Sequence, residues 1–104
     1  MTEPIEHTLE KRGGKYGTIE NNAFITQSMM DILAQGKNWD MWSHTHKECS
    51  HMICHKMARM VSGDPWYDDN PLDIEGYARL LSDYIHEIQK LGPEQLSFNF
   101  GEEN

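Results

Sequence analysis

The residues best suited to chemistry lie between positions 48 and 77. The first part of this stretch has the pattern of an amphipathic helix and carries acid, imidazole and cationic groups: Glu48, His51, His55, Lys56 and Arg59. A short acidic loop follows, and a second helix then opens with carboxylates. Carboxylates from two adjacent helices, with lysine and arginine nearby, are what a divalent metal and a polyphosphate would need. The stretch therefore indicates a site for metal and phosphate.

Three acids are the candidate metal ligands: Glu48, Asp69 and Asp73. Asp69 and Asp73 are four residues apart, so they would lie on a common side of a helix whose first turn includes Asp69. Each acid also has an ordinary alternative role, because Glu48 could complete a capping box with Thr45, and Asp73 could simply favour a helix N-terminus. Oxygen ligands suit Mg²⁺ or Mn²⁺ better than zinc, so one of these two ions is the expected cofactor.

Zinc is the alternative metal, because Cys and His side chains crowd into positions 44–55: His44, His46, Cys49, His51, Cys54 and His55. A structural zinc site usually takes paired ligands from two separate elements. Here the cysteines and histidines project from opposite sides of one expected helix, and the sequence contains no second cluster. The two cysteines point in different directions, so we expect reduced thiols in a cytoplasmic protein.

The spacing of apolar residues predicts the helices that must position this chemistry. The first spans about 19–35, and its apolar stripe consists of Phe24, Ile25, Met29, Ile32 and Leu33. The second begins near Ser43 or Thr45 and ends before Gly63. Around this second helix the cysteines fall on an apolar side, and Lys56 lies at the edge of the opposite, polar side.

The third helix is expected to use Asn70 as its N-cap, to place the following proline at its first position, and to end near position 91. The only strand-like piece lies at 96–100, so the expected fold class is all-α. We divide the chain into an N-terminal arm over 1–17, one helical domain over 18–92 and a C-terminal tail over 93–104.

Composition narrows the range of partners. The hydrophobic content of 38% and the mean hydropathy of −0.73 are low for a self-sufficient core, so we expect a homo-oligomer. The net charge of −8 argues against a duplex nucleic-acid ligand, because duplex binders normally carry a basic surface. No apolar run approaches the roughly 20 residues of a membrane span, and the N-terminus lacks the features of a signal peptide. We therefore expect no membrane partner and a cytoplasmic location.

Three groups of residues resemble a known family in their order and spacing. They are Arg12-x-x-x-Tyr16-Gly17-x-x-Glu20-Asn21, Lys56-Met57-Ala58-Arg59, and Asp69-x-x-x-Asp73-Ile74-x-Gly76-Tyr77-Ala78. Over about residues 10–85 the chain is thus similar to small phage-encoded MazG-like all-α nucleoside triphosphate pyrophosphohydrolases. The resemblance implies a bundle of three to four helices that forms dimers or tetramers in the cytoplasm of a bacterial host. It also implies metal-dependent release of pyrophosphate and a monophosphate from a (deoxy)nucleoside triphosphate, in nucleotide-pool control or against host defence.

This hypothesis gives each candidate residue a role. The three acids would hold one or two Mg²⁺ ions, which lower the pKa of an attacking water. Lys56 and Arg59 would bind the phosphates, and His55 or His51 would help to orient the water or the leaving group. Further candidates for contact with the nucleotide are Tyr16, Asn21, Tyr77 and one aromatic from Trp39, Trp42 or Trp66. The alternative is that these side chains anchor the core or an interface.

The chain departs from the family pattern on the first metal helix. That pattern has three acids, Glu-Glu-x-x-Glu, whereas this sequence keeps Glu48 and has His51 in place of a second acid. The alternative function is therefore a protein that binds or sequesters nucleotides with little turnover.

The C-terminal tail suggests a different kind of function. Its residues Gln95-Leu96-Ser97-Phe98-Asn99-Phe100 resemble the hexapeptide by which bacterial proteins bind the sliding clamp. An extended segment with a glutamine and two aromatic side chains fits recognition by an apolar groove. The other interpretation is that Leu96, Phe98 and Phe100 pack on the helices or across an oligomer interface. An interaction protein that acts through this tail is thus a third hypothesis.

Overall fold

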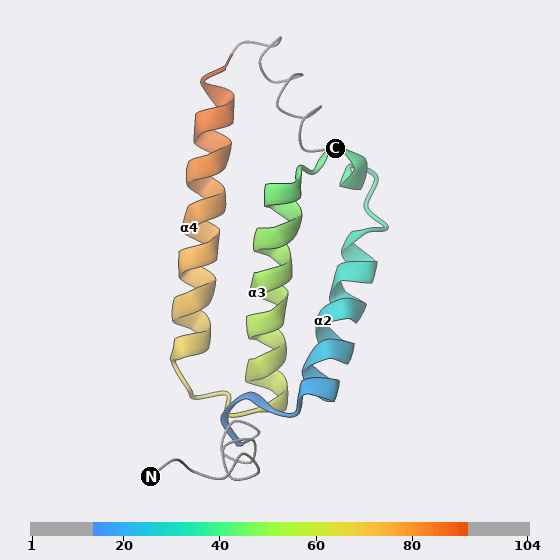
Figure 1. The fold of residues 1–104 in the computed structure, drawn as a ribbon, viewed down its shortest axis with the longest axis vertical. Helices are drawn as coiled ribbons and strands as arrows, with labels where there is room; N and C mark the ends of the chain where they lie inside the picture. The colour runs from blue at the N-terminus through green and yellow to red at the C-terminus, as the bar shows by residue number, and fades with distance from the viewer. Residues whose placement is uncertain (1–13, 92–104) are drawn as a thin grey trace, which may run out of the picture.

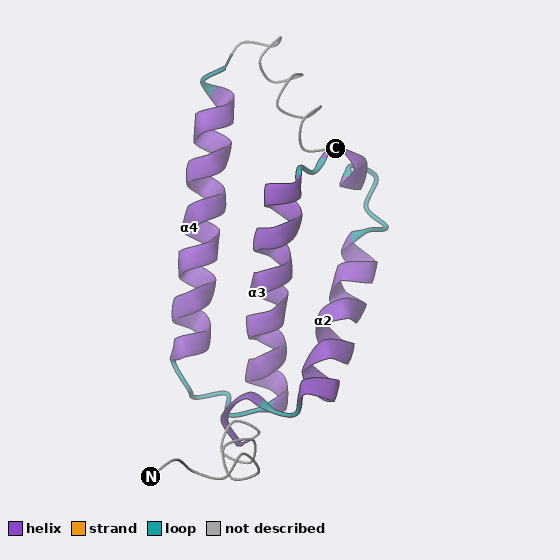
Figure 2. Ribbon diagram, in the orientation of Figure 1, coloured by secondary structure: helices purple, strands orange, loops and turns teal. Residues whose placement is uncertain are grey.

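The computed structural model describes residues 14–91, and this part of the chain is all-α (Figure 2). Its elements are α2 (Ile19–Leu33), the short 3₁₀ helix η1 (Trp39–Met41), α3 (His44–Ser62) and α4 (Asp69–Gln89). The predicted fold class is therefore confirmed for the described residues. The clamp-like segment at 95–100 and Arg12 of the family-like pattern lie outside them.

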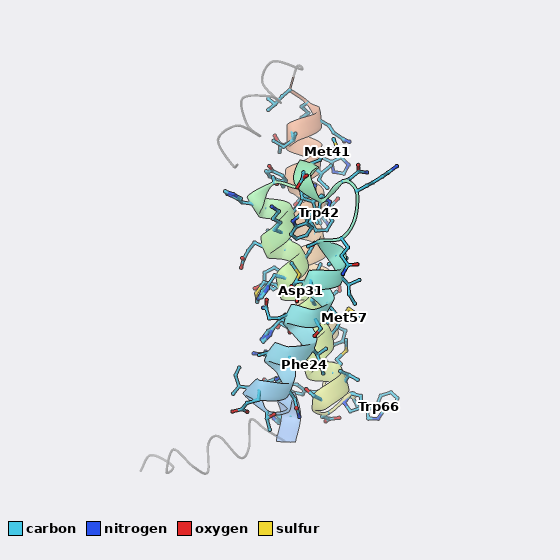
Figure 3. The ribbon with its side chains drawn as sticks, turned by 90° about the vertical axis from the view of Figure 1, so that its right-hand side faces the viewer. Phe24, Asp31, Met41, Trp42, Met57 and Trp66 are labelled. Atoms are coloured by element: carbon cyan, nitrogen blue, oxygen red, sulfur yellow. The ribbon has the colours of Figure 1, made fainter. Side chains whose placement is uncertain are left out.

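The three long helices lie side by side in one layer, with α3 in the middle (Figure 1). Successive helices run in opposite directions, and α3 packs against both α2 and α4. When the molecule is turned by 90°, the helices lie one behind another (Figure 3). In such a layer α2 and α4 cover two opposite sides of α3. No helix among the described residues covers the two broad faces of the layer. No helix within residues 14–91 is long and apolar enough to cross a membrane.

Side-chain caps define where α2 and α3 begin, and both helices match their predicted bounds to within two residues. The Thr18 hydroxyl accepts a hydrogen bond from the Asn21 N–H at 3.2 Å at the start of α2. At the start of α3, the Ser43 hydroxyl accepts from the His46 N–H, and His46 Nδ1 accepts from the Ser43 N–H. The predicted Thr45–Glu48 capping box is therefore wrong, because Ser43 caps the helix and an imidazole takes the place of the glutamate.

The start of α4 also differs from the prediction. The N-cap position is Asp68, and Asn70 lies inside the first turn with only 1% of its surface exposed. Pro71 consequently occupies the third helical position. A helix tolerates proline there because the first four N–H groups have no partner within the helix.

The interior of the layer is built from small and polar side chains. Within residues 14–91 the buried hydrophobic side chains are those of Cys49, Cys54 and Ala58. On α2 the buried residues are Asn22 and Thr26. The buried side of α2 therefore does not coincide with its apolar stripe.

Several large apolar side chains of α2 are exposed to solvent. Phe24 is 75% exposed and projects from the outer side of α2 (Figure 3), and Ile32 is 67% exposed. Lys56, by contrast, is buried, although its position at the edge of a polar side predicted exposure. A packing partner on α4 explains this burial.

Candidate functional site

The end of the layer where α3 finishes and α4 begins is held together by an N-terminal segment. We call this end, with residues 15–18, the foot; it is the lower end in Figure 1. The Asp64 N–H donates to the Lys15 carbonyl oxygen at 2.9 Å, and Asn22 Nδ2 donates to the Tyr16 carbonyl oxygen at 2.6 Å. Gly17 has a φ of 78°, a backbone conformation that glycine adopts readily and other residues rarely do. The segment therefore passes tightly across the end of α3.

This segment places two tyrosines and two cations together at the foot. The guanidinium carbon of Arg59 lies 4.6 Å from the ring centroid of Tyr16, and Lys15 Nζ lies 4.8 Å from that of Tyr67. The two rings meet edge to face with centroids 5.6 Å apart. Cations over aromatic faces are attracted by the ring quadrupole. The arrangement thus combines positive charge with flat aromatic surface.

The acids at the start of α4 join this group. The Tyr67 hydroxyl donates to Asp69 Oδ2 at 2.7 Å. Hydrogen bonding with the side chains of Tyr16 and Asp69 raises the pKa of Tyr67, so this phenol remains a donor at neutral pH. Asp69 is exposed, so its carboxylate remains open to solvent on its other side.

A lysine–aspartate ion pair connects α3 to α4 one turn further up the layer. Lys56 Nζ lies 2.8 Å from Asp73 Oδ2, and the side chain of Lys56 is only 10% exposed whereas that of Asp73 is 47% exposed. Arg59 follows Lys56 by three residues on α3, and Asp69 precedes Asp73 by four on α4. Residues at these spacings are neighbours on a helix surface. Lys56 and Asp73 therefore face each other, with Arg59 and Asp69 on the neighbouring turns of their helices.

Two polar groups at the foot are buried without a hydrogen-bond partner among residues 14–91. They are Arg59 Nε and both side-chain amide atoms of Asn70, which lies between Asp69 and Asp73 in the sequence. Leaving a buried polar atom unpaired is unfavourable, so native proteins rarely do so without a reason. These atoms can hydrogen-bond to a polar ligand.

His55 lies on α3 next to Lys56. Burial lowers the pKa of His55, and the positive charges of Arg59 and Lys56, with a contribution from His51, lower it further. The imidazole is therefore neutral at neutral pH and can accept a hydrogen bond from a water molecule. This property suits the role that the sequence hypothesis gives to His55.

Glu48 lies apart from the other two predicted metal ligands. It precedes Lys56 by eight residues on α3, which is about 12 Å along the helix axis. It lines a separate hollow of about 480 Å³ together with Met30, Trp39, His44, Lys47, His51 and Met52. Within residues 14–91 no group of three or more His, Cys, Asp and Glu side chains could hold a metal ion. The three-acid metal site therefore stays a prediction.

The pair Asp69 and Asp73 fits a more limited metal site. Mg²⁺ is commonly bound by one or two carboxylates together with waters and the phosphates of a substrate. Both carboxylates belong to the first turns of α4, and both are at least partly open to solvent. Lys56 competes for Asp73, because the two already form an ion pair.

The cysteines do not favour the zinc alternative. Cys49 and Cys54 are buried and free. Burial raises the pKa of both thiols, and the nearby Glu48 carboxylate raises that of Cys49 further. Zinc binds thiolates, and a raised pKa disfavours that form.

Sequence reasoning found part of the foot and missed part of it. Among the predicted residues, those that come together there are Tyr16, Lys56, Arg59, Asp69 and Asp73. Tyr77 is half-buried one turn after Asp73, and Asn21 is exposed with its backbone N–H engaged by the Thr18 cap. The residues that sequence reasoning missed are Lys15, Asn22, Ser62, Tyr67 and Asn70. Two of them could have been predicted from sequence position, because Lys15 is next to Tyr16 and Tyr67 is next to the acids at 68–69.

No protein-family model matches this chain, and no curated protein or solved structure matches it either.

Proposed function

We propose that the foot binds a nucleoside triphosphate and that, with Mg²⁺ or Mn²⁺, the protein hydrolyses it to a nucleoside monophosphate and pyrophosphate. The observation that carries this proposal is the Lys56–Asp73 ion pair beside Arg59 and Tyr16. It joins cations for phosphate, carboxylates for a metal and an aromatic ring in one small region. The family-like pattern of the sequence supports the same function.

The roles of the α3 cations follow from their surroundings. Arg59 presents a planar guanidinium that can form two parallel hydrogen bonds to phosphate oxygens, and its Nε has no partner within the described residues. Lys56 is close enough to Asp73 to hold this carboxylate in place when no phosphate is bound. A bound triphosphate would compete with Asp73 for the ammonium group. Binding would thereby free one carboxylate oxygen when the phosphates arrive.

The acids and the histidine would serve the hydrolytic step. Asp69 and Asp73 are the residues that would hold the metal ion. When bound, that ion would neutralise phosphate charge and lower the pKa of a water molecule. His55, kept neutral by burial and by the neighbouring cations that lower its pKa, would accept a hydrogen bond from the attacking water. The Tyr16 ring would offer a flat surface to the base.

A second candidate function is nucleotide binding without turnover. Two observations favour it: Glu48 lies about 12 Å along α3 from Lys56, and Asp73 is already neutralised by Lys56. A protein with this geometry would hold phosphates through its cations and would lack a complete set of metal ligands. The two functions differ only in whether the bound triphosphate is cleaved.

Pyrophosphate release tests the enzymatic proposal directly. The purified chain is incubated with a panel of ribo- and deoxyribonucleoside triphosphates, with Mg²⁺, with Mn²⁺ or with EDTA. We expect release with a metal and none with EDTA. Asp69→Asn should lower the rate by about 100-fold, because it removes an exposed metal ligand but keeps an oxygen that can accept the Tyr67 hydrogen bond.

Asp83→Asn is the matched control. It also removes a carboxylate from α4, but Asp83 lies on the exposed surface, where it pairs with Arg79 at 3.2 Å. Its rate should equal that of the wild type. Nucleotide-induced thermal stabilisation without pyrophosphate release would select the second candidate, and the absence of both would end the proposal.

A further inference from the structure

A second candidate binding site lies at the end of the layer opposite the foot. The last turn of α2, the 3₁₀ helix η1 and the first turns of α3 meet at this end (Figure 1). They border the hollow of about 480 Å³ whose lining includes Met30, Trp39, Lys47, Glu48 and Met52, and which we call the Trp39 hollow. Small-molecule pockets in proteins typically measure roughly 300–1,000 Å³. The Trp39 hollow therefore has room for a small organic ligand.

Contacts outside the hollow hold Trp39 in place. The centroids of the Trp39 and Trp42 rings are 5.3 Å apart, and Trp42 in turn stacks on the His46 imidazole of α3 at 5.6 Å. The Trp39 N–H donates to the Gly36 carbonyl oxygen at 3.1 Å, which closes the turn before η1. The indole is thus positioned before a ligand arrives, and such preorganisation lowers the entropy cost of binding.

Lys47 and Glu48 bring opposite charges to this hollow without neutralising each other. They are consecutive residues on α3, so their side chains leave the helix about 100° apart. Lys47 Nζ lies over the Trp39 ring, 4.9 Å from its centroid, where the ring quadrupole attracts the ammonium group. No ion pair joins Glu48 to a cation within residues 14–91. The hollow therefore presents an ammonium group and a separate carboxylate.

We propose that the Trp39 hollow binds a free α-amino acid with an aromatic or large apolar side chain. The ammonium group of the ligand pairs with Glu48, and its carboxylate pairs with Lys47. Its side chain packs beside Trp39, Met30 and Met52, which form the apolar part of the lining. Methionine side chains are flexible and make favourable contacts with aromatic rings, so this part of the site accepts side chains of different shape.

Charge favours a zwitterion over a ligand of one sign. An anion would meet the Glu48 carboxylate, and the net charge of −8 on the chain repels anions at longer range. A cation would meet the Lys47 ammonium group. A zwitterion satisfies both groups and brings no net charge of its own. The Trp39 hollow and the foot therefore differ in the class of ligand that they bind, and this inference does not depend on nucleotide hydrolysis.

Isothermal titration calorimetry of the full chain tests the proposal with L-phenylalanine and two analogues. 2-Phenylethylamine lacks the carboxylate, and 3-phenylpropionate lacks the ammonium group. Each analogue should bind at least about 10-fold more weakly than phenylalanine, because it leaves one charge of the hollow without a partner. Equal affinity for all three compounds would overturn the proposal, as would the absence of saturable phenylalanine binding up to about 10 mM.

Glu48→Gln tests the role of the carboxylate. It should weaken phenylalanine binding by about 10-fold but should not weaken binding of 3-phenylpropionate, which has no ammonium group to pair with Glu48. The matched control is Glu75→Gln, because Glu75 is exposed on α4 and does not line the hollow. A Glu48→Gln protein that binds phenylalanine as tightly as the wild type would contradict the proposal.

A second measurement uses the wild type alone and does not depend on how a variant folds. Phenylalanine is titrated into the ¹⁵N-labelled full chain without nucleotide or metal, and amide and indole N–H shifts are followed. We expect the largest shifts at the Trp39 indole and at the amides of Lys47 and Glu48. Shifts confined to the foot, or no shifts at all, would overturn the proposal and would leave the nucleotide site untouched.

Discussion

The two sides of α3 hold their neighbouring helices by different chemistry. Toward α2 the contacts at the foot are neutral: the Ser62 hydroxyl lies within hydrogen-bonding distance of Asn22 Oδ1, and Asn22 Nδ2 donates to the Tyr16 carbonyl oxygen. Toward α4 the contact is an ion pair between Lys56 and Asp73. Both sides rely on polar groups, but only one places charge in the interior.

This difference separates the residues that maintain the structure from those that could act on a ligand. Neutral hydrogen bonds satisfy buried groups and fix geometry at small net cost. A buried ammonium group loses its favourable hydration free energy, and attraction to the partner carboxylate offsets this loss only in part. A lysine held in this way beside an arginine has a ready alternative partner in phosphate. The α4 side of α3 is therefore where the chemistry is proposed.

The largest expected effect on stability comes from Gly17→Ala, which disrupts the neutral contacts at the foot. A Cβ at this position would lie 2.7 Å from the Ser62 carbonyl oxygen and 2.8 Å from its carbon, in a backbone conformation with φ of 78°. We expect a loss of about 3 kcal/mol in the free energy of unfolding, from this clash and from the strained backbone. Urea denaturation measures the change.

Gly76→Ala is the control for this substitution. Gly76 lies within α4, and a Cβ there would meet nothing within 4 Å. Alanine should stabilise the protein by roughly 0.5–1 kcal/mol, because glycine is unfavourable inside a helix. Equal unfolding free energies for the wild type and Gly17→Ala would show that the N-terminal segment does not hold the foot together.

The next largest effect comes from breaking the ionic side, and it should be asymmetric. Asp73→Asn leaves the buried Lys56 without its counter-charge and should cost about 2 kcal/mol in unfolding free energy. Lys56→Met replaces the cation by an apolar chain of similar length and leaves a half-exposed carboxylate that water can solvate. Its cost should stay below about 1 kcal/mol. Equal losses for the two variants, measured by urea denaturation, would mean that the lysine is not the buried partner.

The smallest expected effect is a pH dependence of the stability that arises from His55. The pKa of His55 is lowered from its ordinary value of 6.5 in the folded state. As the pH falls below about 6.5, His55 is therefore protonated in the unfolded chain before it is protonated in the folded chain. The free energy of unfolding consequently decreases. This contribution is fully present above pH 6.5 and is lost toward the lowered pKa. His55→Gln should remove it, so the wild type should lose stability relative to the variant as the pH is lowered from 7.5 to 5. A constant difference between pH 7.5 and pH 5 would contradict this origin.

Much of the helical framework was predictable from local signals. The spacing of apolar residues, together with Gly63 at the end of α3, gave the bounds of α2 and α3 closely. Ser43 was one of two predicted starts of α3, but its capping box with His46 was not predicted, because an imidazole replaces the usual glutamate. The predicted cap of α4 was wrong because Pro71 is tolerated beyond the first helical position. Such substitutions leave no distinct pattern in the sequence.

Which side of α2 is buried was not predictable in the same way. An apolar stripe indicates a side that needs a partner, but it does not say whether that partner is a neighbouring helix or another molecule. Phe24 and Ile32 are exposed in the subunit, whereas Asn22 and Thr26 face α3. Within the site, the spacing of three residues on one helix was enough to predict that Lys56 and Arg59 are neighbours. The position of Glu48 relative to α4 depends on how two helices pack, which helix periodicity does not give.

Nuclear magnetic resonance of the ¹⁵N-labelled protein tests the location of nucleotide binding most directly. A non-hydrolysable nucleoside triphosphate analogue is titrated in the presence of Mg²⁺, and backbone amide shifts are followed. The largest shifts are expected at the foot, at Tyr16, Lys56, Arg59 and Asp69. Shifts confined to the hollow around Trp39 and Glu48, or no shifts at millimolar analogue, would contradict a nucleotide site at the foot.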